Sequence, residues 1–236
     1  MSRGVFITGT DTGVGKTLVS ATLLAALNAS GRRALGMKPV ASGCIATPAG
    51  WRSEDALALL EHGADRNTVY SIVNPYTLEE AVAPHLAAAS LGIEIRLDPL
   101  LAAFAALSTN ADFIVVEGVG GWAVPLSPTL MQADLVRALK LPVILVVGLR
   151  LGCINHALLS ARAIRDDGCV LAGWIGSRVD PAMARVEENL ATLRERLPGP
   201  CLGVLPHANA ADPRALAPYL QAAALAITSD AYPPAP

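Results

Sequence analysis

Short apolar runs alternate with longer amphipathic stretches along the chain. The apolar runs predict strands at residues 5–8, 33–40, 113–117, 142–147, 170–175 and 201–205. The amphipathic stretches predict helices at residues 16–29, 53–62, 84–91, 97–107, 129–139, 155–166, 181–197 and 212–226. Strands that are apolar throughout are buried on both faces, which is typical of a parallel sheet covered by helices. The alternation predicts an α/β fold: a doubly wound, mostly parallel sheet with helices on both faces.

The composition leaves the predicted fold unchanged, but it excludes several functional classes of protein. The length of 236 residues suits one domain over residues 1–236, with a proline-rich tail at 231–236 that we expect to be frayed. The formal net charge is -2 and no Lys/Arg run occurs, which argues against a nucleic-acid partner.

The apolar run at 141–149 is too short to span a bilayer, and no signal peptide is recognisable. Four separated cysteines without a CxxC pair indicate reduced thiols, so we expect a cytoplasmic protein without a membrane partner.

Residues 9–17, with the sequence GTDTGVGKT, lie between the first predicted strand and the first predicted helix. Glycines allow the backbone N–H groups to turn inward, and a helix N-terminus adds partial positive charge. Lys16 would reach the β- and γ-phosphates of a nucleoside triphosphate, and the Thr17 hydroxyl would ligate Mg2+. Five residues separate Gly9 from Gly15, one more than in the generic phosphate loop. The alternative is a glycine-rich turn that binds no ligand, but GKT between a strand and a helix favours a P-loop NTPase-like fold.

Only three of the 18 lysine and arginine residues are lysines, so this chain uses arginine where it needs a generic positive charge. Lys38 ends the second predicted strand, and the following Pro39 favours an extended backbone there. In such sheets the carboxyl ends of the strands line the ligand crevice. A compact ammonium at this place could hold an anionic substrate and the transferring phosphoryl group together. A strand-end lysine that faces solvent remains the alternative.

Two carboxylates are candidate magnesium ligands, because Mg2+ prefers hard oxygen atoms and usually keeps several waters. Glu117 ends the apolar strand at 113–117 and is followed by a glycine-rich segment. Asp55 lies in the first turn of the helix at 53–62, which Ser53 could cap. The alternatives are a polar strand end for Glu117 and a dipole-favoured surface acid for Asp55. His85 and His156 are interpreted as structural, and no Cys/His cluster has zinc spacing.

Six motifs together resemble the dethiobiotin synthetase family, in order from residue 1 to about residue 207. They are GTDTGVGKT at 9–17, KPVASG at 38–43, NPY at 74–76, PH at 84–85, VEGVGGW at 116–122 and LGCINH at 151–156. The longer spacing of the phosphate loop is this family's own form. The resemblance implies an ATP-dependent cyclo-ligase of biotin biosynthesis, which closes the ureido ring of dethiobiotin on 7,8-diaminopelargonate with CO2, ATP and Mg2+. It also implies a homodimer whose site lies at the subunit interface.

The resemblance further implies a role for each matching residue. Thr12, Lys16 and Lys38 are the implied catalytic residues, and Thr17, Asp55 and Glu117 the implied magnesium ligands. The implied substrate-binding residues are Ser42, Gly152, Cys153, Ile154 and Asn155, of which the last four form a helix start that meets the substrate carboxylate across the dimer. The implied nucleotide-binding residues are Gly13, Val14, Gly15, Lys16, Thr17, Leu18, Asp55, Glu117, Gly118, Val119, Gly120, Ser177, Arg178, Pro206, His207 and Ala208.

One departure from the family pattern bears on the nucleotide base. Ser177 and Arg178 occupy the place where the family has an asparagine–aspartate pair that hydrogen-bonds adenine. A carboxamide can donate and accept at once, whereas a hydroxyl is shorter and less exacting. The departure predicts relaxed base choice, with other nucleoside triphosphates able to replace ATP.

Two other functions compete with the ligase. The synthetase half of an amidotransferase acting on corrin acids normally carries a glutaminase domain, for which this chain is too short. A P-loop ATPase switch of the partitioning or positioning type carries an extra lysine early in the loop, where this chain has Thr10, Asp11 and Thr12. Such switches also often have a DNA-binding or membrane-binding surface, and the sequence indicates neither.

Overall fold

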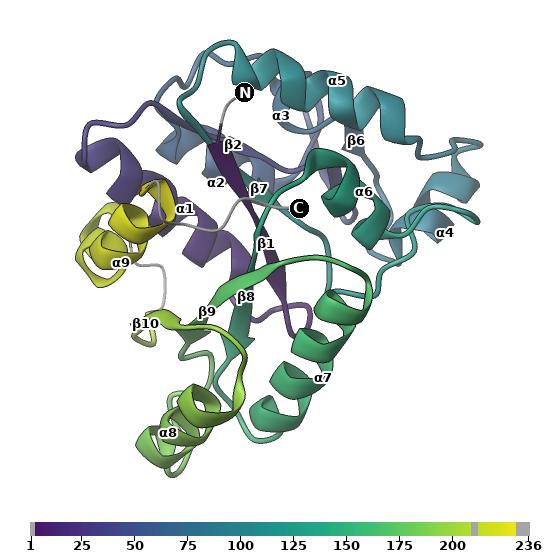
Figure 1. Cartoon of the computed structure of the whole chain (residues 1–236). Helices are drawn as coiled ribbons and strands as arrows, with labels where there is room; N and C mark the ends of the chain where they lie inside the picture. Colours follow the sequence, from purple (N-terminus) through teal and green to yellow (C-terminus); the bar gives the residue numbers. More distant parts are fainter. Residues whose placement is uncertain (1–2, 209–211, 230–236) are drawn as a thin grey trace.

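Six parallel strands form the central sheet of the computed structural model, which describes residues 3–208 and 212–229 (Figure 1). The strand order is β10-β9-β8-β1-β7-β2, and every neighbouring pair is parallel. The fold class predicted from the sequence is therefore confirmed. The strands are β1 (Arg3–Gly9), β2 (Ala34–Met37), β7 (Phe113–Glu117), β8 (Val143–Gly148), β9 (Leu171–Ser177) and β10 (Cys201–Leu205).

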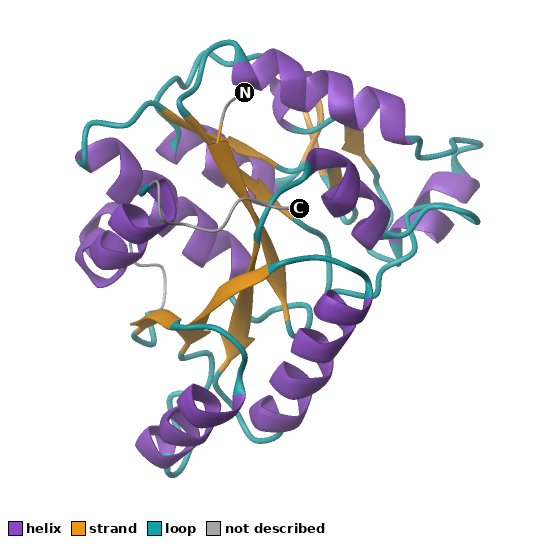
Figure 2. Cartoon of the chain, viewed as in Figure 1, coloured by secondary structure: helices purple, strands orange, loops and turns teal. Residues whose placement is uncertain are grey.

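Helices cover both faces of this sheet (Figure 2). One face packs against α1 (Lys16–Ala29) and α9 (Pro213–Thr228), with α2 (Glu54–His62) against α1 and β2 at the sheet edge. The opposite face packs against α5 (Leu97–Ser108), α6 (Gln132–Leu139), α7 (Cys153–Asp166) and α8 (Val186–Arg196). The short helices α3 (Tyr70–Val73) and α4 (Pro84–Ser90) lie in the long connection between β2 and β7.

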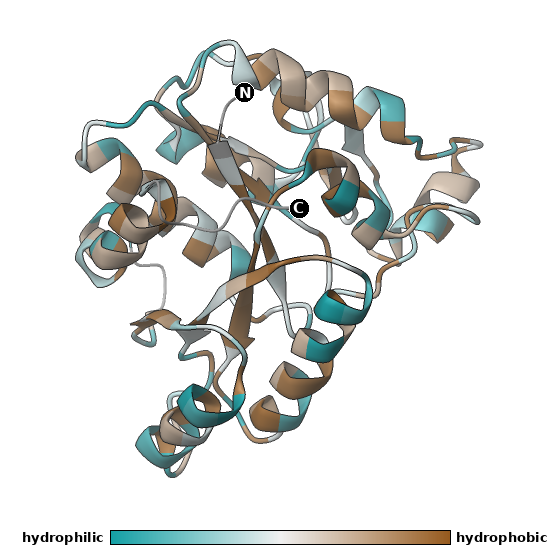
Figure 3. Ribbon diagram, viewed as in Figure 1, coloured by the Kyte–Doolittle hydropathy of each residue, from teal (hydrophilic) through white to brown (hydrophobic). Residues whose placement is uncertain are grey.

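Burial on both faces explains why the strands are apolar throughout. In β1, Val5 and Ile7 pack against α1 and α9, whereas Phe6 between them packs into the opposite layer. All five residues of β7 and all six of β8 are buried. In Figure 3 the apolar strands lie inside, and the helices α7 and α8 outside them carry both hydrophilic and hydrophobic turns. Each large aliphatic side chain buried in this way contributes about 1.5–3 kcal/mol to folding.

The predicted strand at 33–40 is wrong in its second half, because β2 ends at Met37. Pro39 has no N–H to donate to a ladder, and the N–H of Lys38 donates instead to Val73 O at 2.8 Å. The chain continues as β3 (Val40–Ala41), which pairs with β6 (Tyr76–Thr77) in a separate small sheet.

Several other boundaries also differ from the sequence prediction. The helix predicted at 181–197 begins at Val186, because Asp180 accepts the Ala182 N–H in a turn and Arg185 has a left-handed φ of 56°. The helix predicted at 129–139 begins at Gln132, and the one predicted at 155–166 begins at Cys153. The antiparallel hairpin of β4 (Ile45–Thr47) and β5 (Gly50–Arg52) was not predicted; it is short and largely exposed.

Some sequence predictions are not tested by this structure. The tail at 231–236 lies outside the described residues, and the extent of one domain over 1–236 stays a prediction, as does the cytoplasmic location. Within residues 3–208 and 212–229, no helix is both long and apolar enough to cross a bilayer.

Candidate active site

The carboxyl ends of all six strands lie along one edge of the sheet, because the strands are parallel. The phosphate loop follows β1, at the middle of this edge. Lys38 directly follows β2, and Glu117 is the last residue of β7, so both lie on one side of the loop. The segment 152–155 follows β8, and Ser177 ends β9, on the other side. The strand order thus divides the predicted site residues into two groups that flank the loop.

The phosphate loop has the backbone that anion binding requires. Gly13 and Gly15 have φ values of 72° and 87°, in the left-handed region that favours glycine. Gly15 is the N-cap of α1, whose first turn leaves backbone N–H groups without intrahelical partners. The ammonium of Lys16 lies over the loop and donates to Asp11 O at 3.0 Å. Burial and the neighbouring Lys38 ammonium lower the pKa of Lys16 to about 8.

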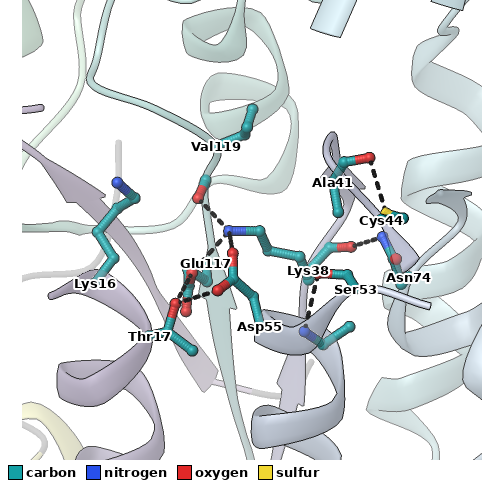
Figure 4. Close-up of polar contacts among 12 residues, drawn as sticks. Lys16, Thr17, Lys38, Ala41, Cys44, Ser53, Asp55, Asn74, Glu117 and Val119 are labelled. Carbon is teal, nitrogen blue, oxygen red and sulfur yellow. Dashed lines mark hydrogen bonds and ion pairs between the residues drawn. The ribbon is translucent and has the colours of Figure 1, made fainter. Parts of the chain in front are cut away.

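Lys38, Glu117, Asp55 and Thr17 converge beside this loop (Figure 4). The ammonium of Lys38 donates to Glu117 Oε1 at 2.7 Å and Gly118 O at 3.0 Å, and lies 2.8 Å from Asp55 Oδ2. The side chains of Lys38 and Glu117 are 2% and 0% exposed, whereas that of Asp55 is 41% exposed. The alternative of a Lys38 that faces solvent is therefore wrong.

Opposite charges stabilise this buried cluster. Burial alone would lower the pKa of Lys38, but the carboxylates of Glu117 and Asp55 outweigh it and raise that pKa above its ordinary value. Burial alone would raise the pKa of Asp55, but the Lys38 ammonium holds that pKa below its usual range. Lys38 and Asp55 are therefore both charged at neutral pH. Removing one partner of a buried ion pair is costly, because the other charge is left buried without compensation.

The oxygen atoms of Thr17, Asp55 and Glu117 fit a magnesium ion. Thr17 Oγ1 lies 2.7 Å from Asp55 Oδ1 and 2.9 Å from Glu117 Oε1, although one hydroxyl hydrogen can serve only one acceptor at a time. Glu117 Oε2 is buried and has no hydrogen-bond partner in the described part of the chain. The set contains two carboxylates, and no group of three or more His, Cys, Asp or Glu suited to a metal occurs among the described residues. Two carboxylates and a hydroxyl suit Mg2+, which usually keeps waters and takes substrate phosphate as a ligand.

The glycine-rich segment after β7 is shaped by close packing. A Cβ at Gly118 would lie 2.6 Å from Gln132 Oε1, so only glycine fits there. Gln132 is buried; its Oε1 accepts the Val119 N–H at 2.9 Å, and its Nε2 donates to Gly121 O at 2.8 Å. Gln132 was not predicted as a site residue, because in the sequence it is only one polar residue of an amphipathic helix pattern.

The remaining predicted residues on the Lys38 side lie in different environments. Thr12 and Gly13 are exposed on the loop, and the Thr12 N–H donates to Asp11 Oδ1 at 2.7 Å. Ser42 is half-buried just after β3. Val14 is fully buried in the core, so only its backbone is available to a ligand. Leu18, Val119 and Gly120 are half-buried.

The residues predicted to hold the base form a second group along the same edge. Ser177 is buried, and its Oγ lies 2.6 Å from where a Cβ on Gly15 would be, so the hydroxyl faces the phosphate loop. The Arg178 N–H donates to Leu205 O at 3.1 Å, and His207 Nδ1 lies 2.9 Å from Arg178 O. Pro206 and Ala208 are half-buried beside them.

Comparisons with known proteins agree with this geometry. A family model described as an AAA domain matches residues 3–215. A Xanthomonas euvesicatoria pv. vesicatoria (strain 85-10) protein described as ATP-dependent dethiobiotin synthetase BioD is 58% identical over 216 residues, covering 92% of this chain and 96% of that protein. A Xylella fastidiosa (strain 9a5c) protein with the same description is 59% identical over 202 residues, covering 86% and 89%. This chain belongs to the ATP-dependent dethiobiotin synthetase family. The predicted family and enzyme class are confirmed.

Solved structures of more distant proteins share the fold alone. MinD of Aquifex aeolicus, a cell division protein, has a TM-score of 0.59 at 16% identity and covers 98% of this chain and 99% of its own. A ParA family ATPase of Chlorobium tepidum TLS has a TM-score of 0.54 at 13% identity, with 97% and 95% coverage. These likenesses carry no argument for a switch function, and membership of the synthetase family favours the ligase.

Proposed function

We propose that this dethiobiotin synthetase joins 7,8-diaminopelargonate and CO2 through a carbamate, which ATP converts into a carbamic–phosphoric anhydride. The observation that carries the proposal is the buried Lys38 ammonium held between Asp55 and Glu117 beside the phosphate loop. Burial and, after it, the Lys38 ammonium lower the pKa of the Lys16 ammonium to about 8, so two positive groups act in the same site. Such a pair suits a reaction that brings two anions, a carbamate and a triphosphate, into contact.

The reaction needs no covalent enzyme intermediate. One amine of the substrate attacks CO2 and loses a proton, which gives a carbamate anion. A carbamate oxygen attacks the γ-phosphorus in line, and ADP leaves. The second amine then attacks the carbonyl carbon of the anhydride, the ring closes and inorganic phosphate leaves with the bridging oxygen. The protein supplies positioning and charge neutralisation.

Lys38 must exchange one of its partners to serve this reaction. An ammonium has three N–H donors, and those of Lys38 face Glu117 Oε1, Asp55 Oδ2 and Gly118 O. Asp55 is the partner with room to move, because its side chain is 41% exposed. Thr17, Asp55 and Glu117 would hold Mg2+, which would supply neutralisation of phosphate charge when bound. When the Asp55 carboxylate turns away from Lys38, one Lys38 N–H becomes free for a carbamate or γ-phosphate oxygen.

Isotope transfer tests the carbamate step. With oxygen-labelled bicarbonate and short reaction times, the released phosphate should carry one bicarbonate-derived oxygen, and phosphate release should depend on 7,8-diaminopelargonate. Phosphate without label would contradict the carbamate route. Equal hydrolysis of ATP without the diamine would favour the ATPase switch instead.

We further propose that the nucleotide base is selected weakly. The hydroxyl of Ser177 faces Gly15 of the phosphate loop, and no carboxamide stands at that position. CTP and GTP are therefore expected to support product formation with kcat/KM within about tenfold of ATP, a difference that one lost hydrogen bond could account for. Competition among the three nucleotides at equal Mg2+ measures this ratio. A preference for ATP of about a thousandfold or more would show that other groups specify adenine.

A homodimer is proposed for the active form. Leu151, which precedes the left-handed N-cap Gly152 of α7, is 96% exposed, and Leu159 of the same helix is also exposed. Within one chain, α7 begins on the side of the phosphate loop opposite Lys38. Backbone N–H groups at 152–155 of one subunit would hold the substrate carboxylate in the partner's site. Cys153 would contribute only its backbone, because its side chain is buried.

Leu151→Glu is expected to weaken this dimer, because it places a charge in an apolar contact. We expect the dimer dissociation constant to rise at least about tenfold, and product formation at low enzyme concentration to fall with it. Leu225→Glu is the matched control, since Leu225 is 58% exposed on α9, away from the site. Light scattering over a dilution series measures the dimer dissociation constant of both variants. A product assay at the same dilutions measures their activity. A wild-type monomer with full activity would refute the proposed assembly.

A further inference from the structure

Asn74 is a buried side chain that touches no reacting group, yet all of its hydrogen-bonding capacity is used. It caps the short helix α3 and is 1% exposed. Its Nδ2 donates to Lys38 O at 2.7 Å and to Tyr76 O at 3.1 Å. Its Oδ1 accepts from the hydroxyls of Tyr70 at 2.9 Å and Thr77 at 3.0 Å. A carboxamide with two donors and two lone pairs is fully satisfied in this way.

The backbone of Lys38 depends on this segment. Lys38 lies beyond the end of β2, so no strand partner satisfies its peptide groups. Its N–H donates to Val73 O at 2.8 Å, and its C=O accepts from Asn74 Nδ2. The segment 73–74 therefore holds Lys38 on both sides of its Cα. These two bonds fix the peptide groups on either side of the Lys38 Cα, from which the side chain extends to Glu117.

Tyr70 extends the same network to the helix that carries Asp55. Its hydroxyl accepts the N–H of Ser53 at 2.7 Å and donates to Asn74 Oδ1. Ser53 is the N-cap of α2, and its Oγ accepts the Ala56 N–H at 3.3 Å. Asp55 follows two residues later, in the first turn. The guanidinium of Arg52 lies 4.1 Å from the centroid of the Tyr70 ring and helps to fix that ring.

We propose that Tyr70 and Asn74 are positioning residues that set the place of Asp55 relative to Lys38. A continuous path of hydrogen bonds runs from the start of α2 through Tyr70 and Asn74 to Lys38. Asp55 lies 2.8 Å from Lys38 Nζ and 2.7 Å from Thr17 Oγ1, so a small shift of α2 alters both contacts at once. The inference rests on the roles proposed above for Lys38 and Asp55.

The size of the effect follows from the geometry that the reaction requires. Side chains that act on a transferring phosphoryl group must be held to a fraction of an ångström by residues behind them. A misplacement of about 1 Å at the reacting groups costs on the order of a hundredfold in rate. Residues behind metal ligands typically change metal affinity or activity by about ten- to a hundredfold. Loss of the Tyr70 hydroxyl should therefore affect both turnover and the response to Mg2+.

Tyr70→Phe tests the proposal, because it removes both hydrogen bonds and keeps the ring that contacts Arg52. We expect kcat to fall at least about tenfold and the affinity for Mg2+–ATP, measured by calorimetry without diamine, to fall several-fold. The KM for 7,8-diaminopelargonate should change by less than about threefold, since Tyr70 does not touch the substrate. Thr77→Val removes the hydroxyl that donates to Asn74 Oδ1 but keeps the Tyr70 hydroxyl, so it should give a smaller effect in the same direction.

Tyr76→Phe is the matched control. Its hydroxyl also accepts a backbone N–H, that of Arg96 at 3.1 Å, but has no link to Lys38 or Asp55. The backbone oxygen of Tyr76 that Asn74 uses is unchanged by this substitution. Both variants lose a tyrosine hydroxyl that accepts a backbone N–H, but Tyr70→Phe also loses the bond to Asn74, so its thermal midpoint should be the lower of the two. In Tyr76→Phe, kcat and Mg2+–ATP affinity should stay near wild type.

The outcomes separate this inference from the proposed function. Wild-type turnover and Mg2+–ATP affinity in Tyr70→Phe would overturn the positioning role of Tyr70 and Asn74. Equal losses of turnover and Mg2+–ATP affinity in Tyr70→Phe and Tyr76→Phe would also overturn it, because they would indicate a general effect on folding. Absence of dethiobiotin with the wild-type protein would refute the proposed function instead. The difference in Mg2+–ATP affinity between Tyr70→Phe and Tyr76→Phe would still decide whether the pair positions Asp55.

Discussion

Replacing Lys38 by alanine should abolish dethiobiotin formation and largely spare nucleotide binding. Lys38 is the buried ammonium beside the phosphate loop, whereas in the proposed site Lys16 and the loop backbone hold the phosphates. Loss of a group that stabilises developing charge typically lowers kcat by about a hundred- to a thousandfold. The affinity for ATP should change by less than about fivefold, because the loop itself is untouched. Product detection and calorimetry with ATP measure the two effects separately.

Stability must be followed in the same variant. Without Lys38, Glu117 is left buried beside Asp55, and breaking a buried pair in this way costs about 3–5 kcal/mol. Lys38→Arg keeps the charge and should fold, but the planar guanidinium cannot reproduce the three contacts of a compact ammonium. We expect it to be inactive as well. Lys140→Ala, at an exposed lysine after α6, is the control. Near-normal turnover of a folded Lys38→Ala would show that the role given to Lys38 is wrong.

Glu117→Gln should raise the magnesium requirement and lower turnover. Glutamine keeps the shape of the side chain and can still accept from Lys38, so the fold should survive. It replaces one carboxylate oxygen by an NH2 group and removes the negative charge that Mg2+ would use. We expect half-saturating Mg2+ to rise at least about tenfold and kcat to fall at least about a hundredfold. A Mg2+ titration of product formation at saturating ATP gives both values.

Glu54→Gln provides the comparison for this charge change. Glu54 is an exposed acid at the start of α2, next to Asp55 but outside the cluster. It should retain the wild-type magnesium dependence. If Glu117→Gln also kept that dependence, the buried carboxylate would serve only as the partner of Lys38, and the assignment of Glu117 to the metal would have to be withdrawn.

Local sequence patterns were sufficient for the six strands of the central sheet, apart from the end of β2, and for the phosphate loop. Apolar runs predict β7 and β8, because both faces of these strands are buried. Gly13 and Gly15 predict a tight turn, and both residues have left-handed φ values. The positions of Lys38 and Glu117 at strand ends also follow from the sequence. Their contact does not, because it requires β2 and β7 to be neighbours in the sheet. The order of parallel strands is determined by tertiary packing. The lengths of the connections between strands do not reveal this order.

The parts of the site that escaped prediction depend on long-range contacts between polar side chains. Asp55 was predicted as a magnesium ligand, but its contact with Lys38 was not predicted, because only the placement of α2 beside β2 brings the two side chains together. Asn74 belongs to the NPY motif at residues 74–76, but the sequence did not indicate its role. Its hydrogen-bond partners Lys38 and Tyr70 are known only from the fold. Gln132 was only one polar residue in an amphipathic helix pattern. Asn74 and Gln132 bind backbone groups beyond the strand ends, whereas Asp55 binds the side chains of Lys38 and Thr17. In each case the partner is distant in the sequence, and a single sequence does not reveal it.

Mass detection of dethiobiotin is the decisive test of the proposed reaction. Purified protein is incubated with 7,8-diaminopelargonate, carbon-labelled bicarbonate, ATP and Mg2+, and the products are analysed by mass spectrometry. We expect dethiobiotin with the label in the ureido carbon, formed in equal amount to phosphate and absent when ATP, Mg2+ or the diamine is omitted. ATP hydrolysis without labelled dethiobiotin, or product formation that is independent of ATP, would contradict the proposed reaction.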